Sequence, residues 1–437
     1  MTIPSPSGCF DILPIDAKDF WKSSYLWIFI EKILREHATL YGFDEIRTPM
    51  FERTELFQRS VGDETDIVSK EMYTFLDRGG RSLSLRPEYT ASVIRAFIEN
   101  KLAQTASTHR FFYIGPMFRY ERPQAGRFRQ HHQFGVEVIG LAQPELDAEI
   151  IEMCYSLYEK LGLKNLTVYV NSLGDKETRV RFRTALVDYL KPYFESLSSE
   201  SKKRFEVNPL RIFDSKAEAD REALKNAPSI LEFLSPECKE HFQQVTAILE
   251  HLKIPFKVNS NLVRGLDYYT KTVFEITSGD LGAQNTVGAG GRYDGLIKDL
   301  GGPDLPSIGF ATGIERIIQT LIKSEGKLPE RRSPDVYIIP LGIEALYRTF
   351  SLVKELRQNG ISCLQGMSGK KLKHEMHEAS DSRAKFTIVL GENEIKANVC
   401  ELKEMSTGTT QKVSLNEVLA FLKNAKNTAS TGLATKK

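Results

Sequence analysis

Apolar residues recur at spacings of three and four between Phe20 and Leu40. This period predicts an amphipathic helix, which Gly42 ends. Residues 44–49 then predict an extended segment that a proline closes. Two β-type runs, Phe111–Tyr120 and Phe134–Ile139, flank a polar loop that contains Pro and Gly. They predict an antiparallel hairpin with a long tip.

The pattern changes near residue 174. Long charged stretches with the helical period run to about residue 252 and predict a helical insertion within the first domain. Strand-like residues return at Thr272–Thr277, followed by a glycine-rich stretch to residue 302 and by a helix that begins near Ile314. We therefore expect one α+β domain over residues 1–325, built on an antiparallel sheet flanked by helices.

The C-terminal part has a different pattern. Residues 323–335 combine Gly, Pro and charge, which is typical of a linker. Beyond them strand and helix patterns alternate, which predicts an α/β domain over residues 333–426. Residues 427–437 are expected to form a flexible tail.

Composition adds limits to this scheme. The chain has 437 residues, 41% hydrophobic and 27% charged, as expected of a globular protein with several domains. Its longest compact apolar run, Tyr25–Ile30, is too short to cross a membrane. The five cysteines are scattered without a CxxC pair, so we expect free thiols and no structural zinc. The N-terminus has no secretory signal pattern, so we expect a cytoplasmic protein.

Charge is unevenly distributed along the chain. The net charge is +2, but from Arg331 onward 17 Lys and Arg face 11 Asp and Glu, a balance of +6 that leaves −4 for the rest. A basic C-terminal unit fits a polyanionic partner such as a nucleic acid. A solvated Lys-rich surface explains the charge equally well.

The hairpin loop carries the densest cluster of candidate functional residues. Four arginines fall within eleven residues, Arg119 to Arg129. Guanidinium groups bind phosphate oxygens in pairs and stay charged, so this density suits a polyphosphate. The alternative is a solvated hairpin tip. Glu121 repels phosphate, so it either accepts from a base amino group or orients an arginine.

Three further clusters follow along the chain. Residues 262–270 contain Arg264 before two tyrosines, which are either functional or half-buried strand residues. The glycines of residues 288–295 indicate backbone pressed against a ligand or another strand. Residues 309–317 predict a strand, a turn and a helix with Arg316 in the first turn. No segment matches a P-loop, so any ATP binds without one.

Two histidine patterns are weaker candidates. The string His374-Glu375-Met376-His377 has its histidines three apart rather than four, so we interpret it as an exposed helix and not as a zinc site. His131 and His132 follow the arginine-rich loop, and we interpret them as ordinary hairpin residues.

Taken in order, these motifs resemble a known family. The extended segment with Pro49, then Phe118-Arg119-x-Glu121, then Gly309 to Arg316 resemble the three signature motifs of class II aminoacyl-tRNA synthetases. Residues 264–269 and 290–294 are similar to the two histidine motifs of the bacterial-type histidyl-tRNA synthetases, and so is the string from Arg122 to Gly135. One departure is Tyr89, where the resemblance leads us to expect glycine.

The resemblance implies a reaction and its site. Histidine and ATP would form histidyl-adenylate, and the histidyl group would pass to tRNA(His). Arg119 and Arg264 would hold the α-phosphate as catalytic residues. The other ATP contacts would be Glu121, Arg127 and Arg316, with Mg²⁺ bridging the phosphates. No protein side chain is assigned to a metal.

The resemblance also assigns the amino-acid and tRNA contacts. Glu88, Thr90 and Gln133 would hold the α-ammonium group, Glu137 and Tyr269 would bind the imidazole nitrogens, and Tyr89 and Tyr268 would line the wall. Arg122 and Gln124 would contact the tRNA acceptor end, and the C-terminal domain would bind the anticodon. The resemblance also implies a homodimer, with the segment around residues 42–49 at the interface.

Two other functions compete with this one. The first is a catalytically silent paralogue, such as the regulatory subunit of histidine biosynthesis, but such chains lack the C-terminal domain and typically lose catalytic arginines. The second is a tRNA-binding scaffold, in which the arginines would be idle. Histidine-dependent exchange of pyrophosphate with ATP separates all three.

Overall fold

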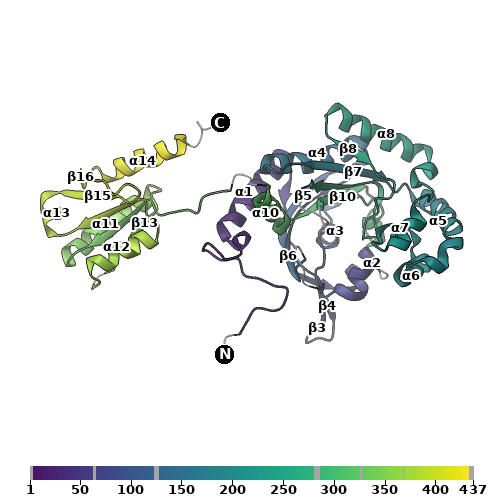
Figure 1. The fold of residues 1–437 in the computed structure, drawn as a ribbon, viewed down its shortest axis with the longest axis horizontal. Coiled ribbons are helices and arrows are strands. Elements are labelled where there is room, and N and C mark those ends of the chain that lie inside the picture. The colour runs from purple at the N-terminus through teal and green to yellow at the C-terminus, as the bar shows by residue number, and fades with distance from the viewer. Residues whose placement is uncertain are drawn as a thin grey trace. The chain divides into compact units, whose positions relative to one another are not determined.

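The computed structural model describes residues 3–62, 65–122, 127–279, 286–324, 328–367 and 369–432. The chain divides into two compact units, residues 1–329 and 330–437 (Figure 1). The division falls inside the stretch of Gly, Pro and charge at residues 323–335. Among the described residues, no helix has both the length and the apolar character that a bilayer crossing requires.

The first unit is built on an eight-stranded sheet. In spatial order its strands are β1 (Asp44–Glu45), β5 (His109–Phe118), β6 (Gln130–Ile139), β11 (Ser307–Gly313), β10 (Thr286–Arg292), β9 (Thr270–Ser278), β7 (Leu166–Ser172) and β8 (Phe256–Val258). The neighbours are antiparallel except for the edge pairs β1–β5 and β7–β8. The antiparallel sheet and the β5–β6 hairpin confirm the sequence prediction.

Alternation along the strands separates the two faces of this sheet. On β6, Phe134, Val136 and Val138 are fully buried in the main core. The core also holds residues of α1 (Ser24–Leu40), α4 (Pro144–Leu161), α8 (Pro236–His251) and α10 (Ile314–Lys323). Because successive side chains of a strand point to opposite faces, Gln133, Gly135 and Glu137 lie on the other face. That face holds the candidate site.

Helix α1 follows its predicted pattern. Leu26, Ile30 and Leu34 are buried at spacings of four and pack into the main core. Gly42 takes a φ of +74° just after the helix, a conformation that glycine adopts without strain. The chain then turns into β1 beside β5, and this places residues 44–49 next to the hairpin.

The helical segment expected at residues 174–252 divides into two packing groups. Helices α5 (Lys176–Leu190), α6 (Ser199–Val207) and α7 (Glu218–Leu224) share a separate core that includes Phe182 and Leu186. Buried Asp220 ties this group together, because it accepts from the hydroxyls of three serines. Helix α8 instead packs on the main core through Val245 and Leu249. Only α5, α6 and α7 therefore pack together as a separate insertion, and α8 belongs to the main core.

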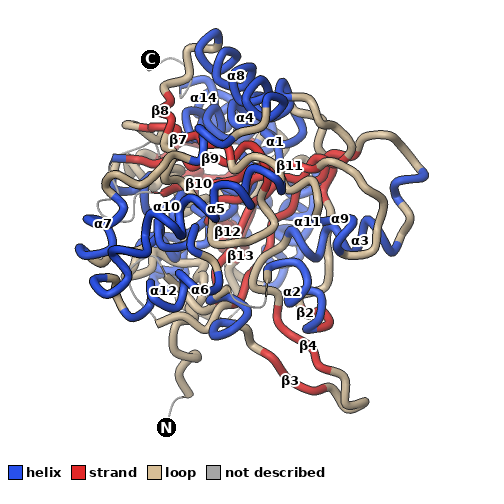
Figure 2. Tube along the Cα trace, turned by 90° about the vertical axis from the view of Figure 1, so that its right-hand side faces the viewer, coloured by secondary structure: helices blue, strands red, loops and turns tan. Residues whose placement is uncertain are grey.

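A small sheet extends from the first unit (Figure 2). It consists of β2 (Phe51–Arg53), β4 (Ser82–Leu85) and β3 (Thr74–Leu76), and it is followed by α3 (Thr90–Glu99). Helix α2 (Thr54–Val61) packs against α3, and α9 (Leu296–Asp299) lies close to both. The short distance in sequence from β4 to α3 places Glu88 and Tyr89 at the start of α3.

The second unit is an α/β fold with a five-stranded sheet. Its spatial order is β13 (Cys363–Gln365), β12 (Val336–Pro340), β14 (Phe386–Leu390), β15 (Val399–Glu404) and β16 (Thr410–Ser414). Its helices are α11 (Ile343–Gln358), α12 (Leu372–Asp381), α13 (Glu392–Ala397) and α14 (Val418–Gly432). Helix α14 thus continues into the segment expected as a tail from residue 427, while residues 433–437 lie outside the described chain.

Candidate active site

A cleft of about 270 Å³ lies on the open face of the large sheet. Six of the residues selected from the sequence line it: Arg119, Glu121, Arg127, Gln133, Arg264 and Arg316. They come from segments almost 200 residues apart in the chain. Four of the six are arginines, so the cleft has the charge expected of a polyphosphate site.

Each of two cleft arginines is fixed by a backbone carbonyl. Arg119 directly follows β5 and donates from Nε to the carbonyl of Pro87 at 2.8 Å. Arg316 lies in the first turn of α10 and donates to the carbonyl of Thr286 at 2.8 Å. Carbonyl partners orient a guanidinium without neutralising it. Both arginines therefore keep a full positive charge for a ligand.

Glu121 pairs with an arginine of the same loop. Its Oε2 lies 3.1 Å from Nη1 of Arg127, and its side chain is mostly buried. This geometry favours the interpretation that Glu121 orients an arginine. Arg122 is exposed and does not line the cleft. Gln124 lies outside the described residues.

The two neighbouring histidines have different surroundings. The imidazole of His132 is 2.9 Å from a carboxylate oxygen of Glu315, which also accepts from the His132 backbone N–H. This pair is structural and holds α10 against β6. His131 lines the cleft. Burial, together with the Arg119 charge, lowers the pKa of His131 to about 3, so it is neutral at physiological pH.

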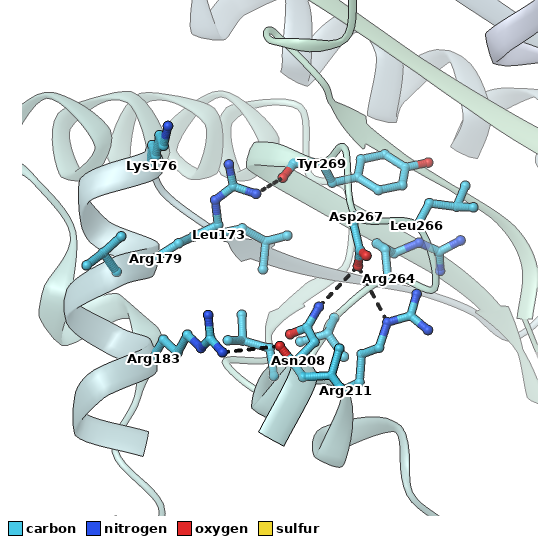
Figure 3. A pocket seen from close by; sticks show the side chains of 14 residues that line it. Leu173, Lys176, Arg179, Arg183, Asn208, Arg211, Arg264, Leu266, Asp267 and Tyr269 are labelled. Atoms are coloured by element: carbon cyan, nitrogen blue, oxygen red, sulfur yellow. Dashed lines mark hydrogen bonds and ion pairs between the residues drawn. The ribbon is translucent and has the colours of Figure 1, made fainter. Parts of the chain in front are cut away.

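Arg264 lies on the loop before β9, between two cavities. On the cleft side its Nη1 is 3.3 Å from Oε2 of Glu275. On the other side is a cavity of about 360 Å³ between this loop and the helical insertion (Figure 3). There Arg179 of α5 donates to the carbonyl of Tyr269 at 3.3 Å, and Arg211 donates to that of Gly265 at 2.7 Å. The insertion therefore holds the loop that carries Arg264.

Glu137 is the centre of a buried hydroxyl network farther along β6. Only 1% of its surface is exposed. Thr90 donates to its Oε1 at 2.7 Å, Tyr113 donates to the same oxygen at 3.4 Å, and Tyr293 donates to Oε2. Burial raises the pKa of Glu137 to about 8. In the empty site Glu137 is therefore largely protonated at neutral pH, and a hydrogen bond from a bound N–H group would favour its carboxylate form.

Glu88 caps the helix that carries Thr90. Its two carboxylate oxygens accept from the backbone N–H groups of Thr90 and Ala91, each at 2.8 Å. The first N–H groups of a helix have no partner within the helix, so Glu88 supplies one. Its negative charge also meets the positive end of the dipole of α3. Burial nevertheless raises the pKa of Glu88.

Tyr89 adopts a backbone conformation that does not require glycine. Its φ is −103° and its ψ −29°, in the ordinary right-handed region. Its ring stacks on that of Tyr113 with 4.0 Å between centroids and 10° between planes. The backbone at Tyr89 is therefore regular, although the resemblance leads us to expect glycine there. Of the two stacked tyrosines, Tyr113 is the one that donates to Glu137.

Tyr268 and Tyr269 lie side by side, with ring centroids 4.8 Å apart. Tyr268 also contacts the ring of Tyr293 edge to face at 5.6 Å. This contact connects the tyrosine pair to the network around Glu137. Both tyrosines are packed rather than exposed.

Sequence reasoning missed three residues of this site: Tyr113, Tyr293 and Glu275. Tyr293 lies inside the glycine-rich motif but received no role, and neither Tyr113 nor Glu275 belongs to any motif singled out from the sequence. Alternation along the strands is the signal that could have found Tyr113. Both Tyr113 and Glu137 alternate with core residues, which places them on the face opposite the core.

Close backbone approach explains the glycine-rich strands. A Cβ at Gly290 would collide with the carbonyl of Gly309, and a Cβ at Gly309 would collide with Glu137. Of the two explanations left open for the glycines of residues 288–295, a ligand or another strand, the strand accounts for Gly290.

The part of the chain that the structure describes contains no cluster of three or more His, Cys, Asp or Glu placed to hold a metal. His374 and His377 are exposed on α12, as the sequence indicated. Glu375 points instead into the second unit, where it accepts from the hydroxyl of Tyr337 at 2.8 Å.

Comparison with known proteins gives the class and then the family. The antiparallel sheet with its arginine cleft, followed by a separate α/β unit, defines a class II aminoacyl-tRNA synthetase. Residues 24–317 match the family model described as histidyl-tRNA synthetase, and residues 335–425 match that of the anticodon binding domain. The chain belongs to the histidyl-tRNA synthetase family, whose members attach histidine to tRNA(His) with ATP.

Individual relatives agree over the whole length. A histidine–tRNA ligase of Protochlamydia amoebophila is 55% identical, over 97% of this chain and 100% of that protein. The ligase of Desulforamulus reducens is 46% identical, over 97% and 99%. The crystal structure of apo S. aureus histidyl-tRNA synthetase matches with a TM-score of 0.81 and 38% identity, over 97% and 100%.

Proposed function

We propose that this chain activates histidine with ATP and transfers it to tRNA(His), and that the open face of the large sheet performs both steps. The observation that carries this proposal is the continuity of two sites on β6. Gln133 lines the arginine cleft, and Glu137 follows on the same face about 13 Å farther along the strand. The proposed phosphate site and the proposed amino-acid site therefore share one face of β6.

In the first step the histidine carboxylate attacks the α-phosphorus of ATP and pyrophosphate leaves. Arg119 and Arg264 approach the α-phosphate from opposite sides and stabilise the negative charge that grows during this displacement. Positioning and electrostatics account for most of the catalysis in such a reaction. Arg127 and Arg316 bind the β- and γ-phosphates.

Mg²⁺ bound to the ATP phosphates would neutralise further charge. Both carboxylates that line the cleft have partners, since Glu315 is held by His132 and Glu121 by Arg127. We therefore assign the Mg²⁺ contacts to the phosphate oxygens and none to a protein side chain.

Histidine recognition rests on Glu137 and Tyr269. A neutral imidazole presents one donor and one acceptor. The Glu137 carboxylate accepts from the imidazole N–H, and the Tyr269 hydroxyl serves the other nitrogen. Glu88, Thr90 and Gln133 hold the α-ammonium group, while Tyr268 and Tyr89 support the wall. Buried polar groups left unpaired by a wrong side chain provide strong discrimination.

In the second step the terminal hydroxyl of tRNA attacks the carbonyl of the adenylate, and AMP leaves. Arg122 is exposed and follows Glu121 of the cleft in the chain, and with Gln124 it would contact the acceptor end. The C-terminal unit, residues 330–437, binds the anticodon arm. Its net positive charge attracts the polyanionic RNA.

The chain acts as a cytoplasmic homodimer in this proposal. The segment around residues 42–49 leads directly into an exposed apolar surface formed by Met50, Phe51, Phe75 and Leu76. Exposed apolar side chains gathered on one small sheet favour contact with a second copy.

Pyrophosphate exchange with ATP tests the activity. It should depend on histidine and proceed without tRNA, and charging of tRNA(His) should require both units. A chain that binds tRNA without histidine-dependent exchange would instead be the scaffold, and one that does neither would be the regulatory paralogue.

A further inference from the structure

Three large side chains form a continuous stack beneath the histidine site. The guanidinium carbon of Arg86 lies 4.0 Å from the centroid of the Tyr89 ring, whose other face stacks on Tyr113. Arg86 and Tyr89 are each 2% exposed and Tyr113 is 1% exposed. None of the three lines the arginine cleft.

Arg86 is a buried cation whose hydrogen bonds go to neutral groups. It donates to the carbonyls of Pro116 at 2.9 Å, of Thr48 at 3.1 Å and of Pro49 at 3.3 Å. Burial lowers its pKa. A charge is expensive to bury, and an apolar side chain would fill the same volume at lower cost. The arginine instead joins the segment 48–49 to the end of β5 and to the Tyr89 ring.

Two glycines make room for the stack. A Cβ at Gly115 of β5 would lie 2.6 Å from Nη2 of Arg86 and 3.1 Å from the Tyr89 ring. A Cβ at Gly135 of β6 would collide with the Tyr113 ring. Both strands are therefore shaped around these three side chains.

The stack ends at the buried carboxylate. Tyr113 donates to Glu137 at 3.4 Å, and Thr90, the neighbour of Tyr89, donates to the same oxygen at 2.7 Å. Any shift of the Tyr89 ring or of its backbone thus moves two of the three hydroxyls that hold Glu137.

We propose that Arg86 and Tyr89 are positioning residues that set the Glu137 carboxylate for histidine, acting through Tyr113 and Thr90 and anchored on the segment 48–49. This inference rests on the proposed role of Glu137. It adds residues that never touch the substrate, and it couples the histidine site to the segment that leads to the exposed apolar surface.

Tyr89→Leu tests this coupling, with Tyr89→Phe as the conservative variant. Leucine fills space but cannot stack, so KM for histidine in pyrophosphate exchange should rise about tenfold while KM for ATP changes less than about twofold. Tyr89→Phe keeps the ring and loses only the hydroxyl that accepts from the Thr48 N–H at 3.4 Å, so KM for histidine should rise less than in Tyr89→Leu. Phe182→Leu is the matched control, because Phe182 is equally buried and packs against Phe213 inside the helical insertion.

The outcomes separate the possibilities. Equal rises in both KM values, or an unchanged KM for histidine with the same loss of thermal stability as Phe182→Leu, would make Tyr89 a packing residue and overturn the inference. If Tyr89→Leu does not fold, Arg86→Lys decides, since lysine keeps the charge but cannot lie flat on the ring; the same selective rise is expected. A wild-type protein without histidine-dependent exchange would refute the proposed function itself.

Discussion

At the residue scale, the proposed reaction gives Arg264 the role of stabilising charge during adenylation. Arg264 lines the cleft together with Arg119, and a carboxylate oxygen of Glu275 lies 3.3 Å from its guanidinium. Arg264→Ala should fold normally and lose adenylate formation by at least about 100-fold, as expected for one preorganised electrostatic group. Pre-steady-state adenylate formation measures this. An equal loss in Arg211→Ala, which removes an anchor of the same loop outside the cleft, would indicate that loop order and not the Arg264 charge is decisive.

Glu137→Gln should affect histidine more than ATP. The amide keeps the size but replaces an acceptor oxygen with a donor NH₂, whereas the phosphate contacts lie on other residues. We expect a raised KM for histidine and a smaller change for ATP when each substrate is varied in pyrophosphate exchange. The competing interpretation, that Glu137 pairs with Arg119, finds no support in the described contacts, where Arg119 donates to Pro87 and Glu137 accepts from hydroxyls. Equal effects on both substrates would refute the specificity role.

The same variant should also change how stability depends on pH. The folded protein raises the pKa of Glu137 to about 8, above its usual value. Between about pH 5 and pH 8 the folded state therefore keeps a proton that the unfolded state has released, and this contribution to stability falls as pH rises. As pH rises through this range in the absence of histidine, the Tm of Glu137→Gln should increase relative to the Tm of wild type. A Tm difference that is constant with pH would contradict a buried, proton-binding Glu137.

At the scale of elements, the start of α3 has a structural role and a proposed role in histidine binding. Glu88 caps the helix through two backbone N–H groups. Glu88→Gln replaces one acceptor oxygen and should lower the free energy of unfolding by about 1 kcal/mol, a typical capping contribution. KM for histidine should rise in the same variant. Asp175→Asn is the control, because Asp175 caps α5 through the Thr178 N–H at 2.7 Å but lies outside the site. A change in KM for histidine of similar size in both variants would argue against a substrate contact by Glu88.

At the scale of the whole molecule, we expect the first unit to form the adenylate and the second unit to contribute to tRNA binding. Asp335 belongs to the second unit, where it accepts from Lys385 at 3.1 Å and from Lys426 at 3.2 Å. The chain is therefore best cut after Pro329. Charging of tRNA(His) should then fall by about 100-fold because one of two linked binding sites is lost, while pyrophosphate exchange is largely retained. An equal fall in both, with the fragment folded and dimeric, would make the second unit a stability element.

Elements with strong local signals, and the order of the motifs, can be read from the sequence alone. The spacing of apolar residues predicts α1, alternation and a polar loop predict the β5–β6 hairpin, and the glycines of β10 predict close contact with a ligand or another strand. Helical period and strand alternation are local properties, so they are readable without the fold. The arginines Arg119, Arg264 and Arg316 were selected because they accompany such elements in a recognisable order.

Which side chains meet depends on how distant elements pack together. Tyr113, Thr90 and Tyr293 converge on Glu137 because β5 pairs with β6, the end of β10 lies one strand away across β11, and the start of α3 meets the same face. The stacking of Tyr89 on Tyr113 depends on the same packing. A residue pattern records which face of its own element a side chain occupies. Which other elements pack on that face depends on long-range contacts, and no local signal in the sequence encodes them.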